Sequence, residues 1–158
     1  MVIGANRLLL ALAIAAIGIL SYSAGYTSAT TKSPTPAIID VTIKALTETK
    51  LTAIEDIPYW KIIGGRGARA AGVSAYVSSD KKFDVGVSRY EPVTLQLHNW
   101  PIDEFMYIVE GNVEITDDSG HSRTYGPGDA FLMPKGFEGT WKQHSEIKKI
   151  NVAYDPAK

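Results

Sequence analysis

Short stretches that alternate apolar and polar residues recur along the second half of the chain. In Asn112–Thr116, Val and Ile alternate with Glu and Thr, and Val93–His98 alternates in the same way. This period of two is typical of β-strands with one buried face and one solvated face. Glu104–Val109 is longer and mostly aromatic or β-branched, a composition that also favours a strand. The pattern therefore predicts strands rather than helices in this part of the chain.

Turn sequences separate these stretches. The Asp and Ser side chains of Asp117–Gly120 can bond their own backbone, and its Gly accepts a positive φ. Gly126–Asp129 is a second turn of this kind. We expect further strands at Val73–Val77, Val85–Tyr90, Phe131–Pro134, Thr140–Gln143 and Ile147–Tyr154. We also expect Val93–His98 to pair with the Glu104–Val109 strand across its loop. Many short strands and almost no helix predict an all-β fold, a closed jelly-roll barrel of two sheets.

The segment before this region is harder to assign. Ile38–Thr52 alternates enough to favour an early strand, although Lys44–Ile54 also has the composition of a short helix. Asp56–Ile63 should begin extended, because the residue before Pro58 avoids the helical region. The glycine-rich stretch Gly64–Gly72 carries two arginines but lacks the flanking strand, helix and Lys of a phosphate-binding loop. We therefore expect a loop at the edge of the barrel.

The first 29 residues have the order of a secretory signal. One basic residue in Met1–Arg7 precedes the apolar run Leu8–Leu20, and Ser21–Ala29 is small and polar. As a helix, this run would rise about 20 Å, which is short of a bilayer core of about 30 Å. We expect a cleaved signal peptide, with an uncleaved membrane anchor as the alternative. Either assignment places the remaining domain in the periplasm or outside the cell, or anchored to the cytoplasmic membrane and facing outward.

This order gives three parts: residues 1–29 as signal peptide or anchor, residues 30–54 as linker and early strand, and residues 55–158 as the β domain. Residues 27–36 are rich in Ser, Thr and Pro, the composition of a linker. The chain has 158 residues, enough for one domain and these extra segments. A net charge of -1 gives no reason to expect nucleic acid as a partner. With no cysteine, disulfides and thiolate metal sites are excluded.

Two spacings point to a family. Glu104 is followed by six residues and Gly111, and Gly128 is followed by five residues and Pro134-Lys-Gly136. These spacings resemble the two motifs of the cupins. Three local sequences are closer still to the small cupins similar to the cupin domain of (S)-ureidoglycine aminohydrolase: Asp103-Glu-Phe, Tyr107–Gly111 and Gly136–Trp141. The resemblance implies the cupin double-stranded β-helix. It also implies a possible homodimer, because cupins commonly dimerise through their sheets.

In cupins that bind metal, the resemblance implies four ligands, namely three His and one Glu. Glu104 matches the Glu, and His98 matches the first His in one spacing variant. The second His falls on Trp100 and the third on Gly139, which cannot act as ligands. Metal sites need several converging nitrogen or oxygen donors. We therefore expect no metal and no other cofactor; the alternative is a divalent metal completed by Gln96, Gln143 or water.

Strand alternation predicts which side chains face the barrel interior. If Glu104 points inward, Met106 and Ile108 do so too, while Phe105 and Tyr107 point outward. The expected ligand-binding residues are His98, Trp100, Glu104, Met106, Trp141 and Gln143. Each has a structural alternative: His98 could simply neutralise a buried Glu104, and Trp141 could belong to the core.

Three functions follow from this pocket. The first is an exported cupin that binds a small polar molecule without metal. The second is an enzyme similar to ureidoglycine aminohydrolase, with Glu104 and His98 as acid and base. The third is a structural or partner-binding jelly roll. A preformed cavity favours the first two, and a filled interior favours the third.

Overall fold

The computed structural model describes residues 37–158. The predicted signal peptide or anchor and the Ser-, Thr- and Pro-rich linker sequence, residues 27–36, lie outside these residues. Within residues 37–158, no helix is long and apolar enough to cross a membrane.

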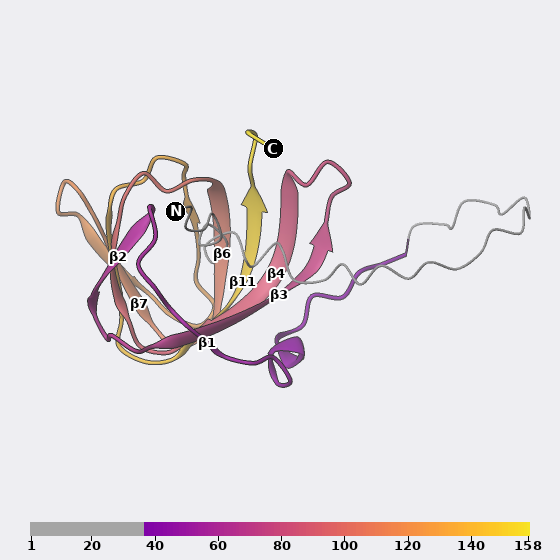
Figure 1. The fold of residues 1–158 in the computed structure, drawn as a ribbon, viewed down its shortest axis with the longest axis horizontal. Helices are drawn as coiled ribbons and strands as arrows, with labels where there is room; N and C mark the ends of the chain where they lie inside the picture. The colour runs from indigo at the N-terminus through magenta and orange to yellow at the C-terminus, as the bar shows by residue number, and fades with distance from the viewer. Residues whose placement is uncertain (1–36) are drawn as a thin grey trace, which may run out of the picture.

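Two antiparallel sheets face each other (Figure 1). Sheet A has six strands, in the order β1 (Thr52–Ala53), β3 (Arg69–Val77), β4 (Phe83–Tyr90), β11 (Ile147–Tyr154), β6 (Asp103–Glu110) and β9 (Ala130–Met133). Sheet B has five, in the order β2 (Trp60–Gly64), β5 (Thr94–Leu97), β10 (Gly139–Gln143), β7 (Val113–Asp117) and β8 (Ser122–Tyr125). The predicted all-β fold of two sheets is confirmed.

The chain crosses between the sheets after β5. The predicted pairing of Val93–His98 with the Glu104 strand is therefore wrong: β5 pairs with β2 and β10, whereas β6 pairs with β11 and β9. The connecting loop is not a hairpin turn. Asn99 has a φ of 43°, and the amide and carbonyl of Trp100 bond instead to Phe137 and Gly136 in the turn before β10. This loop spans the gap between the sheets and brings Trp100 to the mouth of the barrel.

The predicted faces of β6 are confirmed. Glu104, Met106 and Ile108 are buried, while Phe105 and Tyr107 are exposed. The inner faces of both sheets supply the main core, which contains Ile54, Ile57, Trp60, Ile62, Ala68, Val93, Leu95, Leu97, Met106, Ile108, Val113, Ile115, Met133, Trp141 and Ile147. Glu104 thus lies on the same inward face as core residues.

The predicted turns also form. The Asp117 Oδ1 atom accepts hydrogen bonds from the amides of Ser119 and His121, both at 3.0 Å. The Asp129 Oδ2 atom accepts one from the Gly126 amide at 2.9 Å. At both turns an aspartate carboxylate thus serves as the hydrogen-bond acceptor for nearby backbone amides, as the sequence indicates.

The N-terminal part differs from the prediction. A 3₁₀-helix, η1 (Ile43–Leu46), replaces most of the expected early strand, and only Thr52–Ala53 pair with β3. The Thr42 side chain caps the helix by accepting a hydrogen bond from the Lys44 amide. Leu46 is only 2% exposed, and η1 packs against β3, β4 and β11. Burial of this one leucine favours a helical turn over continued alternation.

The glycine-rich loop is shorter than expected. Strand β2 ends at Gly64 and β3 begins at Arg69, so residues 69–72 are strand rather than loop. Gly65 has a φ of 72°, and a side chain there would collide with the carbonyl of Pro92. Arg69 forms an ion pair with Glu91, which ties the start of β3 to the end of β4. The loop therefore leads out of β2, the edge strand of sheet B, as expected of a loop at the edge of the barrel.

Candidate functional site

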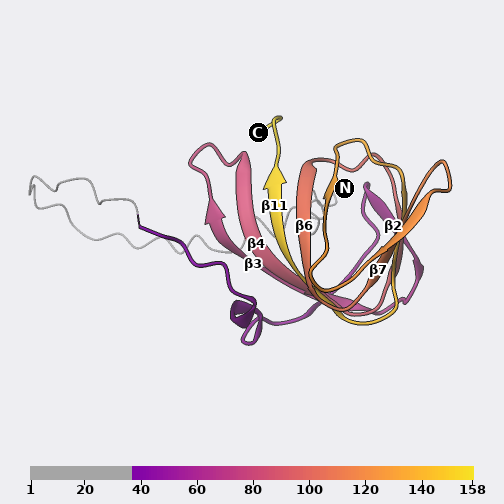
Figure 2. The same cartoon turned by 180° about the vertical axis from the view of Figure 1, so that it is seen from behind.

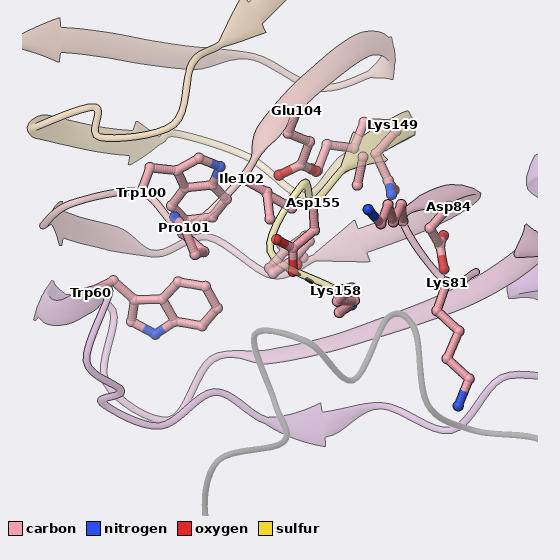
Figure 3. Close-up of a pocket in the computed structure, with 14 residues that line it drawn as sticks. Trp60, Lys81, Asp84, Trp100, Pro101, Ile102, Glu104, Lys149, Asp155 and Lys158 are labelled. Carbon is pink, nitrogen blue, oxygen red and sulfur yellow. Dashed lines mark hydrogen bonds and ion pairs between the residues drawn. The ribbon is translucent and has the colours of Figure 1, made fainter. Parts of the chain in front are cut away.

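A cavity opens between the two sheets at the end of the barrel that carries the Trp100 loop (Figure 3). Its volume is about 60 Å³. The indole rings of Trp60 and Trp100 lie on one side of it, and Glu104 and Lys149 lie on another. Farther in, an apolar compartment lined by Leu95, Leu97, Met106, Met133 and Trp141 shares four residues with the outer one: Trp60, Tyr90, Trp100 and Lys149.

A buried ion pair stands at the boundary of these compartments. The Lys149 Nζ atom lies 2.8 Å from Glu104 Oε1, and the two side chains are only 5% and 6% exposed. Both residues point inward from neighbouring strands, β11 and β6. Buried charges need close partners, because leaving water costs several kcal/mol per ion. Each of these two residues is therefore the main electrostatic partner of the other.

Lys149 also lies near a sulfur atom and two aromatic rings. Its Nζ atom lies 3.3 Å from the Met106 sulfur, 5.9 Å from the centre of the Tyr90 ring and 5.8 Å from the centre of the Trp141 ring. Aromatic faces attract cations at such distances. The site is thus an ammonium ion surrounded by rings, a sulfur atom and one carboxylate.

His98 lies elsewhere. Its side chain is 48% exposed, and its Nδ1 atom lies 3.4 Å from Glu138 Oε2 on the outer side of sheet B. The expectation that His98 faces the cavity, or neutralises Glu104, is therefore wrong. In β5 the apolar side chains of Leu95 and Leu97 occupy the inward positions, which places His98 on the opposite face. Lys149, rather than His98, is the residue that pairs with the buried Glu104 carboxylate.

The other expected residues surround the cavity. Trp100 stacks on Trp60, with ring centres 6.1 Å apart, and lines both compartments. Met106 and Trp141 line the inner compartment. Gln143 does not line either compartment; instead, its Oε1 atom accepts a hydrogen bond from Trp141 Nε1 at 2.8 Å. Gln143 therefore orients the ring of Trp141, and ligand contact by these residues stays a prediction.

Two further titratable groups face the cavity. Burial, together with the nearby Glu104 carboxylate, raises the pKa of Tyr90 well above its ordinary value of 10.0, so its phenol stays protonated. Burial also raises the pKa of Asp84 above 3.8, although a hydrogen bond from the Ser74 hydroxyl opposes this shift. Sequence reasoning missed Tyr90, Asp84, Trp60 and Lys149.

The residues present do not fit the family's four-ligand metal site. In residues 37–158, no group of three or more His, Cys, Asp or Glu side chains could hold a metal ion. The Glu104 carboxylate already has the Lys149 ammonium 2.8 Å away, and a second cation there would be repelled. Glu104 is the only one of the four motif positions that keeps both its ligand atom and its inward direction in this part of the chain.

Fold and site together define a small jelly-roll barrel with a cation-bearing cavity. Residues 78–150 match the family model of the EutQ-like cupin domain. A protein of unknown function from Pseudomonas syringae pv. tomato superposes with a TM-score of 0.60 at 18% identity, over 68% of this chain and 45% of that one. The EutQ protein of Clostridium difficile superposes with a TM-score of 0.50, also at 18% identity, over 60% and 75% of the two chains.

The chain is similar over residues 78–150 to the EutQ-like cupin domain, and it shares its fold with these two solved structures. It spans less than half of the Pseudomonas protein, and the likeness to both structures concerns the fold alone. No curated protein has a significantly similar sequence. The closer resemblance to the ureidoglycine aminohydrolase cupin domain stays a prediction.

Proposed function

We propose that this chain is an exported cupin-domain protein that binds a small polar metabolite in its barrel cavity, without a metal ion. One observation carries the proposal: a buried Glu104–Lys149 ion pair lines a preformed cavity with aromatic walls. Ligand sites commonly combine apolar and aromatic walls with a few convergent polar groups.

A purely structural role does not explain why a buried ion pair is present in the barrel. Apolar side chains of similar volume commonly stabilise a core as well as a buried ion pair does, or better. A structural role also predicts a filled interior, whereas Trp60, Tyr90 and Trp100 border open space. These features support ligand binding over the structural alternative.

The enzymatic alternative has less support. General acid–base catalysis needs both groups at one substrate. His98 contacts Glu138 on the outer side of sheet B, while Glu104 contacts Lys149 inside the barrel. The two residues therefore make no acid–base pair in the cavity.

Export and assembly are further parts of the proposal. The proposal of export rests on the signal-like sequence of residues 1–29. We expect contact with a membrane only if this segment is retained as an anchor. A homodimer through the outer face of sheet A is supported by Phe105, Tyr107 and Leu132, which are 42%, 39% and 60% exposed. Phe105 and Leu132 are neighbours across β6 and β9. A second copy could bury this apolar surface by packing the same face against it.

The test is a ligand screen read by tryptophan fluorescence. All three tryptophans of the chain border the cavity, so a bound molecule should change their emission directly. The full chain is titrated with a library of small carboxylates, amides, amines and sugars, and hits are checked by thermal shift. Saturable binding that is weakened by Trp100→Ala supports the proposal. If no compound changes the emission or the melting temperature, binding in this cavity is refuted. Near-stoichiometric metal in protein prepared without a chelator would refute the metal-free part.

A further inference from the structure

We infer that the ligand is a small organic anion, a monocarboxylate with a short apolar or flat body, held by Lys149 and Trp100. This inference rests on the proposed function and specifies its ligand. It is carried by unused hydrogen-bond donors on two residues that line the same cavity, together with the charge of the residues around them.

The first donor is the ammonium of Lys149. It has three N–H groups; one points to Glu104 and one to the Met106 sulfur. No acceptor for the third is found among residues 37–158. Because Lys149 borders both compartments, this remaining N–H can meet an acceptor that enters the cavity.

The second donor is the indole N–H of Trp100. Its nitrogen is buried and has no hydrogen-bond partner in the described part of the chain. The indoles of the other two tryptophans are satisfied, Trp60 by the carbonyl of Glu55 at 2.9 Å and Trp141 by Gln143 at 2.8 Å. Leaving a buried donor unpaired costs about 1–3 kcal/mol. A ligand oxygen that accepts from Trp100 removes this cost.

The charges around the cavity also favour an anion. Four lysines line the outer compartment, against three carboxylates: Lys81, Lys82, Lys149 and Lys158, and Asp84, Glu104 and Asp155. Glu104 is paired with Lys149, and Asp155 is 3.9 Å from Lys158. The Asp84 carboxylate accepts from the Ser74 hydroxyl, and its burial disfavours the charged form. Lys81 and Lys82 have no ion pair among the described residues, although Lys82 also lies near Asp80. The net formal charge of the residues that line the outer compartment is therefore positive.

The size and lining of the cavity limit the rest of the molecule. One water needs about 10–15 Å³ of such space, so about 60 Å³ holds only a few waters or one small head group. The inner compartment is formed mainly by Leu95, Leu97, Met133 and aromatic rings. A carboxylate at Lys149 would place a short apolar tail against these side chains.

The experiment compares two pairs of molecules that differ in charge but little in shape: propionate with propionamide, and benzoate with benzamide. Each is titrated into the full chain while the three indole N–H signals are followed by NMR. We expect the carboxylates to bind at least about tenfold more tightly than the amides, with the largest shift at the Trp100 signal. Equal or tighter binding of the amides would overturn the inference.

Two variants test the role of Lys149. Glu104→Gln removes the competing carboxylate and should raise carboxylate affinity by about threefold or more. The double variant Glu104→Gln, Lys149→Met has side chains of similar volume but no buried charge pair. It should lose the preference for carboxylates over amides. Lys142→Met removes a lysine from the exposed face of β10 and is the matched control. Lower carboxylate affinity in Glu104→Gln, or an unchanged preference in the double variant, would contradict the inference.

The outcomes separate the two proposals. If neutral or cationic compounds from the screen bind and carboxylates do not, the cavity is a ligand site but the anion inference fails. If no compound shifts any indole signal, the ligand site itself fails.

Discussion

Removing one member of the Glu104–Lys149 pair should destabilise the protein far more than removing both. At 2.8 Å, the attraction between the charges is about 6 kcal/mol with an effective dielectric constant of about 20. The desolvation of two side chains that are only 5% and 6% exposed offsets most of this attraction. The pair therefore contributes little net stability, but each charge alone is costly.

The two single variants should differ. Lys149→Met leaves Glu104 without a donor among the described residues and should lower the free energy of unfolding by about 3–5 kcal/mol. Glu104→Gln leaves a cation that keeps the Met106 sulfur, the rings of Tyr90 and Trp141, and an amide oxygen, so we expect a loss of about 2 kcal/mol. The double variant should lie within about 2 kcal/mol of the parent chain.

Urea unfolding at pH 7, followed by circular dichroism, gives these values and their coupling energy. We expect a coupling of at least about 3 kcal/mol. Additive effects of the two changes, or single losses below about 1 kcal/mol, would refute the view that the two charges are buried and mutually dependent.

Four other results are expected. Asp84→Asn should stabilise the fold at pH 7, because the raised pKa of Asp84 makes folding lose stability as the pH rises above 3.8; urea unfolding across pH should show the gain vanish in acid. Gly111→Ala should cost about 2 kcal/mol or more, since φ is 80° and the new side chain would meet the carbonyl of Glu146; an unchanged melting temperature would contradict this. His98→Ala should change stability by no more than about 1 kcal/mol and leave ligand titrations unchanged, whereas a loss of binding would return His98 to the site. Leu132→Glu should convert the proposed dimer to a monomer in sedimentation velocity, and a parent chain that sediments as a monomer would exclude that dimer.

The sequence predicted the strands and faces well where alternation was the dominant signal. In β6 the residues that share a face were identified correctly, because the side-chain period of a strand is two. Alternation does not say which sheet a strand joins, so the Val93–His98 strand was given the wrong partner. That choice depends on a loop whose path is set by contacts between Trp100 and the turn before β10.

The site was predicted less completely. Motif spacing drew attention to His98, although Leu95 and Leu97 in the same strand compete for the interior and are more apolar. Lys149 matches no motif, yet the sequence held a clue: it alternates with Ile147 and Asn151, which are also buried. What the sequence could not give is the distance to Glu104, because that contact depends on the pairing of two strands about 45 residues apart.

The position of β11 has a consequence for biosynthesis. It is the last strand along the chain, yet it lies in the middle of sheet A between β4 and β6 (Figure 2). Until Ile147–Tyr154 has emerged, β4 and β6 lack their common neighbour, and the cavity lacks its only interior ammonium among the described residues. A nascent chain can thus make hairpins such as β3–β4 early, but it cannot close the barrel.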